Sequence, residues 1–170
     1  MTMTVDTSLP SSCARAASAE ESRFRIDRPI APSRAGRVVA LDARAAEVVG
    51  RAAQLPWANA RFYACESAGA DTDGLVLRGI DGGPATLADE LASASVVVMV
   101  ATSDAGADCA FTLGKACWER GVQTAGLVIG DGTSETAAAG AVAALRPHAR
   151  VLLPTADETD VVDVLTALRV

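Results

Sequence analysis

The chain has 170 residues, 50 % of them hydrophobic and 21 % charged, which indicates one packed domain and excludes a wholly disordered chain. Its net charge of −6 argues against a general nucleic-acid binder and against a protein that binds anionic membranes. The longest strongly apolar run, Val96–Ala101, is much shorter than the roughly 18 residues that span a bilayer, so no membrane insertion is expected.

The N-terminus and the cysteines indicate the compartment. Residues 1–18 lack the basic start and apolar stretch of a secretory signal, so we expect a cytoplasmic location. The spacing of the cysteines, without any CxxC pair, and the single His148 argue against a metal site. A disulfide framework is not expected in such a chain, and Cys65 and Cys117 are expected to be small buried hydrophobic residues.

Residues 1–36 differ in composition from the rest of the chain. They are rich in Ser, Thr, Pro and Arg, so we expect a flexible tail there. Within this tail, residues 22–30 alternate basic with apolar side chains, which suits an edge strand, a tail that lies on its own domain, or a peptide that docks on a partner. In the last case Phe24, Arg25 and Ile26 would bind the partner.

From residue 37 onward, apolar strands alternate with helices. The first half is predicted to contain, in order, a strand at Val38–Leu41, a helix at Ala43–Gln54, a strand at Arg61–Cys65, a weak strand at Leu75–Leu77, a turn at Asp81–Pro84 and a helix at Thr86–Ala92. Asp42 is placed to cap the first of these helices, because short polar side chains accept hydrogen bonds from the free N–H groups there. Trp57 and Trp118 are expected to cover the edge of the core.

The second half continues the alternation. Val96–Ala101 is a continuous apolar run, typical of a strand covered on both faces. It is followed, in order, by a helix at Ala107–Arg120 with Gly121 at its C′ position, a strand at Thr124–Ile129, a helix capped by Thr133 or Ser134 that ends at Leu145, a strand at Val151–Leu153 and a helix at Asp157–Leu168. We therefore predict an α/β fold over residues 37–170, a single three-layer Rossmann-like domain with a mostly parallel, doubly wound sheet.

The loop over residues 102–108 is the main candidate for a ligand site, because ligands of such sheets bind beyond the carboxyl ends of the strands. Thr102 and Ser103 offer hydroxyl groups, and Gly106 allows a tight turn. The helix that follows offers free N–H groups and a positive dipole end to an anion. Asp104 and Asp108 would repel a phosphate unless Mg²⁺ bridged them, and either of them is alternatively the helix N-cap.

Glu66 is a second candidate. It ends a predicted strand, where the acid of a dinucleotide-binding domain would hold ribose hydroxyls, although surface solvation explains it equally well. The sequence contains no GxGxxG, Walker A or GxSxG motif, so no catalytic residue and no cofactor is identified.

The order of motifs over roughly residues 37–130 resembles the N-terminal nucleotide-binding half of the bacterial tubulin-like division GTPases. A strand ends in the acidic loop 66–73, an RG…GG…P turn follows at 78–84, and an apolar strand then leads into the loop 102–108. Where that family has the phosphate signature GGGTGTG, this chain has SDAGADC. The resemblance implies a degenerate relative that does not hydrolyse nucleotides. TSDAG is also faintly similar to the SxSGxT loop of phosphosugar-binding isomerase domains.

Two functions stay open. The first is a non-catalytic accessory or regulatory protein that binds a protein partner, in a homo- or hetero-oligomer. The second is a protein or enzyme that binds a nucleotide or sugar phosphate through the loop 102–108. The missing nucleotide and nucleophile motifs and the segment 22–30 favour the first.

Overall fold

The computed structural model describes residues 32–67, 75–130, 138–155 and 157–170. The chain separates into two units, Met1–Pro32 and Ser33–Val170, and the fold below is that of the second. The predicted partner-binding residues Phe24, Arg25 and Ile26 lie outside the described residues, as does most of the predicted tail.

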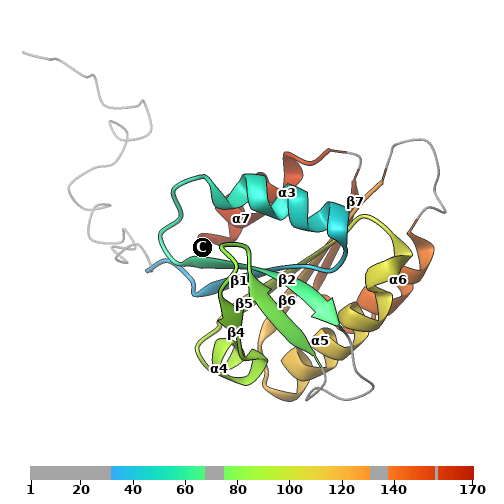
Figure 1. The fold of residues 1–170 in the computed structure, drawn as a ribbon, viewed down its shortest axis with the longest axis horizontal. Helices are drawn as coiled ribbons and strands as arrows, with labels where there is room; N and C mark the ends of the chain where they lie inside the picture. The colour runs from blue at the N-terminus through green and yellow to red at the C-terminus, as the bar shows by residue number, and fades with distance from the viewer. Residues whose placement is uncertain (1–31, 68–74, 131–137, 156) are drawn as a thin grey trace, which may run out of the picture. The chain divides into compact units, whose positions relative to one another are not determined.

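One sheet of seven strands runs through the described part of this unit, in the order β4-β3-β2-β1-β5-β6-β7 (Figure 1). The strands are β1 Gly36–Ala40, β2 Ala60–Ser67, β3 Val76–Gly79, β4 Pro84–Ala85, β5 Val96–Ala101, β6 Gln123–Ile129 and β7 Val151–Thr155. Strands β2, β1, β5, β6 and β7 are parallel, whereas β3 is antiparallel to both β2 and β4. The predicted α/β fold with a mostly parallel sheet is therefore confirmed.

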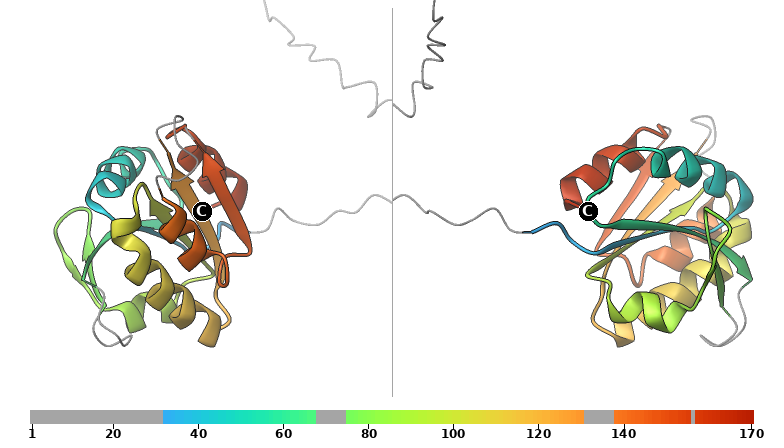
Figure 2. Two further views of the ribbon diagram at one scale, coloured as in Figure 1. Left: turned by 90° about the vertical axis from the view of Figure 1, so that its right-hand side faces the viewer. Right: turned by 60° about the vertical axis from the view of Figure 1, so that its left-hand side comes forward.

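Helices cover both faces of the sheet (Figures 1 and 2). They are α3 Ala43–Ala53, α4 Leu87–Ala92, α5 Ala107–Glu119, α6 Ala139–Leu145 and α7 Asp160–Leu168, with a short 3₁₀ turn, η2, at Asp104–Gly106. Helices α3 and α7 pack on one face, and α4, α5 and α6 pack on the other. None of the helices in the described ranges has the length and apolar character needed to cross a membrane.

Strand β5 lies at the centre of both apolar layers. All of its residues are buried, and successive side chains point to opposite faces, as the pleat of a strand requires. Val98 belongs to the apolar cluster that contains Val49 of α3. Met99 belongs to the cluster that contains Leu113 of α5 and Leu145 of α6. The predicted burial of this strand on both faces is confirmed.

The antiparallel edge of the sheet departs from the prediction. Strand β3 begins at Val76 and reaches Gly79, beyond the predicted Leu75–Leu77, and β4 lies partly within the predicted turn. Gly82 makes the reversal between these strands with φ +92°, a conformation that glycine adopts without strain. Because a two-residue strand is too short for an alternating pattern, its pairing depends on this turn.

Helix ends agree with the prediction where a local residue sets them. Asp42 is the N-cap of α3, and Gly121 follows α5 with φ +67°. Helix α7 begins at Asp160 and not at Asp157, because the Asp157 side chain accepts from the Thr159 N–H at 2.8 Å in a turn before the helix. The predicted caps of the helix before Leu145, Thr133 and Ser134, lie outside the described residues.

Candidate functional site

The topological switch point of this sheet lies between the carboxyl ends of β1 and β5, and we call this position the crevice. From β1 the chain passes to β2 on one side, whereas β5 adds to the other side of β1, so the connections after β1 and β5 diverge. Such a point of divergence is where ligands bind in open α/β sheets. Asp42 follows β1 and Thr102 follows β5, so the predicted loop 102–108 begins at this crevice.

The Asp42 carboxylate accepts hydrogen bonds from N–H and O–H groups at the crevice. Its Oδ2 accepts from the backbone N–H groups of Thr102, at 2.7 Å, and Ser103, at 3.1 Å. Its Oδ1 accepts from the Thr102 hydroxyl, at 2.6 Å, and from the Ala45 N–H, at 2.9 Å. A carboxylate of the chain therefore supplies the negative charge that a bound phosphate would bring to these N–H groups.

Asp104 also makes its bonds inside the molecule. Its carboxylate accepts from the Ala141 N–H at 2.9 Å, so it caps α6 across space. It lies against Gly140, where a Cβ would approach the Asp104 Cγ to 3.0 Å. The alternative that Asp104 caps the helix directly after it is thus wrong, and Ser103 takes that role for η2 by accepting from the Ala105 N–H.

Asp108 and Gly106 have different roles from those predicted. Asp108 lies within the first turn of α5, so it is not the N-cap, and its side chain is exposed. Gly106 has φ −91°, which any residue can adopt. The absence of a side chain at Gly106 lets the backbone of residue 106 approach Leu41 closely, because a Cβ there would lie 2.5 Å from the Leu41 carbonyl oxygen. Gly106 therefore lets the start of α5 pack against the end of β1.

Glu66 is bonded to the neighbouring strand. Its carboxylate forms an ion pair with Arg78 of β3, in which the Arg78 Nη2 donates to Glu66 Oε2 at 3.0 Å. This hydrogen-bonded guanidinium holds the pKa of the exposed Glu66 carboxyl below its usual value. The carboxylate thus joins β2 to β3, and this contact accounts for Glu66 without a ribose ligand.

A disulfide connects the crevice end of β2 to α5. Cys65 and Cys109 are bonded, with their Cα atoms 6.7 Å apart, so the expectation of no disulfide and the interpretation of Cys65 as a small buried hydrophobic residue are wrong. The two positions meet because the end of β2 lies beside the start of α5, a proximity over 44 residues that cysteine spacing does not indicate. Cys117 is a free, buried thiol as predicted, and burial raises its pKa to about 12, which makes it a poor nucleophile at neutral pH.

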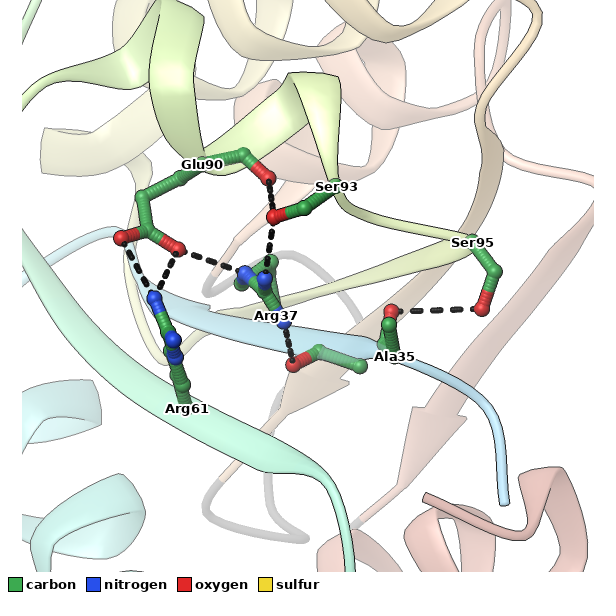
Figure 3. Close-up of polar contacts among 7 residues, drawn as sticks. Ala35, Arg37, Arg61, Glu90, Ser93 and Ser95 are labelled. Atoms are coloured by element: carbon green, nitrogen blue, oxygen red, sulfur yellow. Dashed lines mark hydrogen bonds and ion pairs between the residues drawn. The ribbon is translucent and has the colours of Figure 1, made fainter. Parts of the chain in front are cut away.

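A buried polar cluster lies at the opposite, amino end of the strands (Figure 3). The Arg37 side chain of β1 is 4 % exposed, and its Nε donates to Glu90 Oε2 of α4 at 2.6 Å. Its other nitrogens donate to the Ser93 hydroxyl at 2.7 Å and to the Gly36 carbonyl at 3.0 Å. Arg61 Nη1 of β2 donates to both carboxylate oxygens of Glu90, at 3.2 and 3.4 Å.

The titration of this cluster follows from its burial. Burial, and then the hydrogen bond to Glu90, raise the pKa of Tyr63 to about 12. Burial acts to raise the pKa of Glu90, but the hydrogen bonds from Tyr63 and Arg37 outweigh it and hold that pKa below its usual value. Since Glu90 accepts from charged groups on two strands, the cluster fastens α4 to the sheet. We infer that this cluster stabilises the fold. In the sequence, only the arginine at the start of an apolar strand indicates it.

The outward side of α5 carries the most exposed aromatic side chain described. Trp118 is 73 % exposed and Phe111 is 52 % exposed, and seven residues place them two helical turns apart on one side. Trp118 lines a groove of about 350 Å³ together with Gln123, His148 and Arg150. The prediction that Trp118 covers the core is wrong. Trp57 is half-buried as predicted, and its ring contacts Phe62.

His148 forms a fixed wall of this groove. Its ring lies so close to α5 that a Cβ at Gly114 would approach the ring atoms to 2.8 Å. It also makes an edge contact with Phe111, with ring centroids 5.4 Å apart. Its Nε2 is buried and has no hydrogen-bond partner among the described residues. We refer below to Phe111, Trp118, His148 and Arg150 as the Trp118 surface.

Comparisons with known proteins add no relative. No family model matches the chain, and no curated protein or solved structure matches it either. The features that bear on function are therefore the geometry of the crevice and that of the Trp118 surface.

Proposed function

We propose that this chain is a non-catalytic accessory or regulatory protein, built on a Rossmann-like three-layer domain, that binds a protein partner through the Trp118 surface. The observation that carries the proposal is the 73 % exposure of Trp118 beside the half-exposed Phe111. Tryptophan is among the residues that contribute most binding energy at protein interfaces, and a fully hydrated indole is otherwise unfavourable.

The crevice supports the non-catalytic part of the proposal. A phosphate entering there would have to displace the Asp42 carboxylate and replace the four hydrogen bonds that it accepts. Because those bonds are already charge-assisted, the exchange gains little free energy. A nucleotide or sugar phosphate is therefore the less favoured ligand, and one of the two carboxylate oxygens of Asp104, Oδ1, is already bonded to the N–H of Ala141 in α6.

The position of the Asp42 carboxylate in the crevice fits the resemblance to the tubulin-like GTPases. In the proposed reading, the loop 102–108 descends from a phosphate loop whose glycines were replaced while Asp42 took the position of the phosphate. The chain would then retain the scaffold of a nucleotide-binding half without its ligand.

A photo-crosslinking amino acid at position 118 tests the proposal in cells that produce the chain. Leu55 provides a matched control, because it is an exposed apolar residue at the end of α3, on the other face of the sheet. We expect a discrete crosslinked protein from position 118 and none from position 55. Equal crosslinking at both positions, or none at position 118, would contradict the proposal.

A thermal-shift screen of purified protein tests the less favoured ligand. We expect nucleotides and sugar phosphates, with and without Mg²⁺, to leave the melting temperature unchanged. A phosphate compound that stabilises the wild type, and whose effect is lost in Thr102→Ala, would instead favour a ligand site in the crevice.

A further inference from the structure

The groove beside Trp118 carries a positive charge that no described residue pairs with. Arg150 is the charged residue of the groove's lining, and its guanidinium makes no hydrogen bond or ion pair with any described residue. Gln123, which also lines the groove, accepts from Arg34 Nη1 at 3.1 Å, and the other donors of the exposed Arg34 guanidinium make no side-chain bond among the described residues. Arg150 thus shares the groove with the indole of Trp118, and Arg34 is bonded to Gln123, another residue of its lining.

We infer that the partner presents an acidic segment here, in which carboxylates flank an apolar side chain. This inference rests on the proposed function, since it names the chemistry that the Trp118 surface recognises. The indole of Trp118 offers a flat apolar area, and a guanidinium binds a carboxylate through two parallel hydrogen bonds. In an acidic segment, an apolar residue can pack on the indole and a carboxylate can bind the guanidinium.

A second copy of the chain fits this surface poorly. A two-fold dimer places the same patch of both subunits against each other. The Arg150 side chains of both copies would then lie in one interface, and the Trp118 surface contains no carboxylate to pair with them. A nucleic acid also fits poorly, because the net charge of the chain is −6 and two arginines do not make a basic stripe.

The groove is preformed, which favours recognition of a short segment. The His148 ring is confined between Gly114 and Phe111, and His148 is held further by its backbone oxygen, which accepts from the Thr124 hydroxyl. A wall that is already fixed loses little conformational entropy when a ligand binds.

Selection of displayed random peptides on the intact chain tests the inference without a known partner. We expect the enriched peptides to be acidic and to contain an aliphatic or aromatic residue. Their affinity should fall about tenfold or more in Arg150→Glu and weaken as the salt concentration rises. In Arg150→Lys it should fall less, because lysine keeps the positive charge but cannot form the two parallel hydrogen bonds. Arg44→Glu is the matched control, because Arg44 is an exposed arginine on α3, which covers the other face of the sheet.

The outcomes separate this inference from the proposed function. Peptides that lose affinity in Trp118→Ala but not in Arg150→Glu, or that are neutral or basic, would overturn the acidic partner and leave the Trp118 surface as the binding site. Enrichment that Trp118→Ala does not affect, or no enrichment at all, would overturn both. A dimer in sedimentation that Trp118→Ala dissociates would make the occupant a second copy and would also overturn the inference.

Discussion

The switch-point crevice and the Trp118 surface both carry groups able to hold a ligand, but they differ in how far the chain itself uses those groups. In the crevice, the N–H groups of Thr102 and Ser103 are bonded to Asp42. On the Trp118 surface, the Arg150 guanidinium has no hydrogen bond or ion pair with a described residue, and the indole faces solvent. The start of the loop 102–108 is thus bonded to another part of the chain, whereas the exposed indole and the unbonded guanidinium of the described residues lie at the outer side of α5.

This difference predicts where a ligand can gain free energy. A buried donor that already has a charged acceptor offers an incoming anion only an exchange of partners, whereas an exposed apolar ring and an unpaired cation offer new contacts. Substitutions in the crevice should consequently change stability, and substitutions on the Trp118 surface should change binding.

The largest expected effect comes from the disulfide that joins the crevice end of β2 to α5. Reducing Cys65–Cys109 should lower the free energy of unfolding by about 4 kcal/mol, since a bridge over 44 residues restricts the unfolded chain strongly. Urea unfolding with and without a thiol reductant measures it. Identical midpoints would show that this link does not contribute to stability, and loss of peptide binding after reduction would show that the two regions are coupled.

Substitution of Asp42 comes next. Asp42→Ala should destabilise the protein by about 3 kcal/mol, because it removes an N-cap and leaves the N–H groups of Thr102 and Ser103 without their acceptor. Asp42→Asn keeps an acceptor oxygen and should lose less. Thermal denaturation of both variants is the measurement. An unchanged melting temperature in Asp42→Ala would mean that the crevice does not depend on its internal carboxylate.

The crevice variant also permits a rescue experiment. Acetate or phosphate added to Asp42→Ala should restore part of the lost melting temperature, since an anion can re-enter the vacated position. The wild type should not respond to either anion. A wild type that is stabilised as strongly as the variant would contradict the internal role of Asp42.

Substitution of Glu90 should have a smaller effect on stability, and that effect should depend on pH. It tests a second group of side chains that are bonded to one another within the chain. Glu90→Gln should cost about 2 kcal/mol at neutral pH, because Arg37 keeps its bonds to Ser93 and to the Gly36 carbonyl but loses its charged partner. The folded-state pKa of Glu90 lies below its usual 4.5. The stability that its ionisation contributes is therefore complete above pH 4.5 and disappears as the pH falls through the lower, folded-state value.

The measurement is the difference in unfolding free energy between wild type and Glu90→Gln as a function of pH. That difference should shrink below pH 4.5 as the wild-type carboxylate becomes protonated. A constant difference across this range would mean that the ionised form of Glu90 has no special role in the folded protein. Comparing the two proteins cancels the contributions of Glu66 and Asp157, whose pKa values are also lowered.

The elements that depend on local chemistry could be predicted from the sequence. Six consecutive apolar residues predicted β5 with its observed bounds, and the cap residues Asp42 and Gly121 marked their helix ends. The position of the loop 102–108 at the crevice followed from the alternation of strands and helices. The bonding of that loop could not be predicted, because Asp42 reaches it across 60 residues and Asp104 reaches α6 across 37.

The exposure of Trp118 could have been inferred from helical spacing. Trp118 lies three residues after Lys115 and next to Glu119, so it shares the polar side of α5. The prediction that Trp118 covers the edge of the core did not take this pattern into account. No comparable signal existed for the Cys65–Cys109 bond, because a pairing across the sheet depends on which strands become neighbours.

The smallest expected effect on stability is that of Trp118→Ala. The indole is 73 % exposed, so its removal takes little apolar area out of the core and should change the free energy of unfolding by less than about 0.5 kcal/mol. Leu113→Ala, on the buried side of the same helix, is the matched control and should cost about 2–5 kcal/mol. Urea unfolding of both variants gives the two values. If Trp118→Ala costs as much as Leu113→Ala, the indole is part of the packed structure and the Trp118 surface is not a free binding face. If it costs little and abolishes binding of the selected peptides, stability and recognition are carried by opposite sides of one helix.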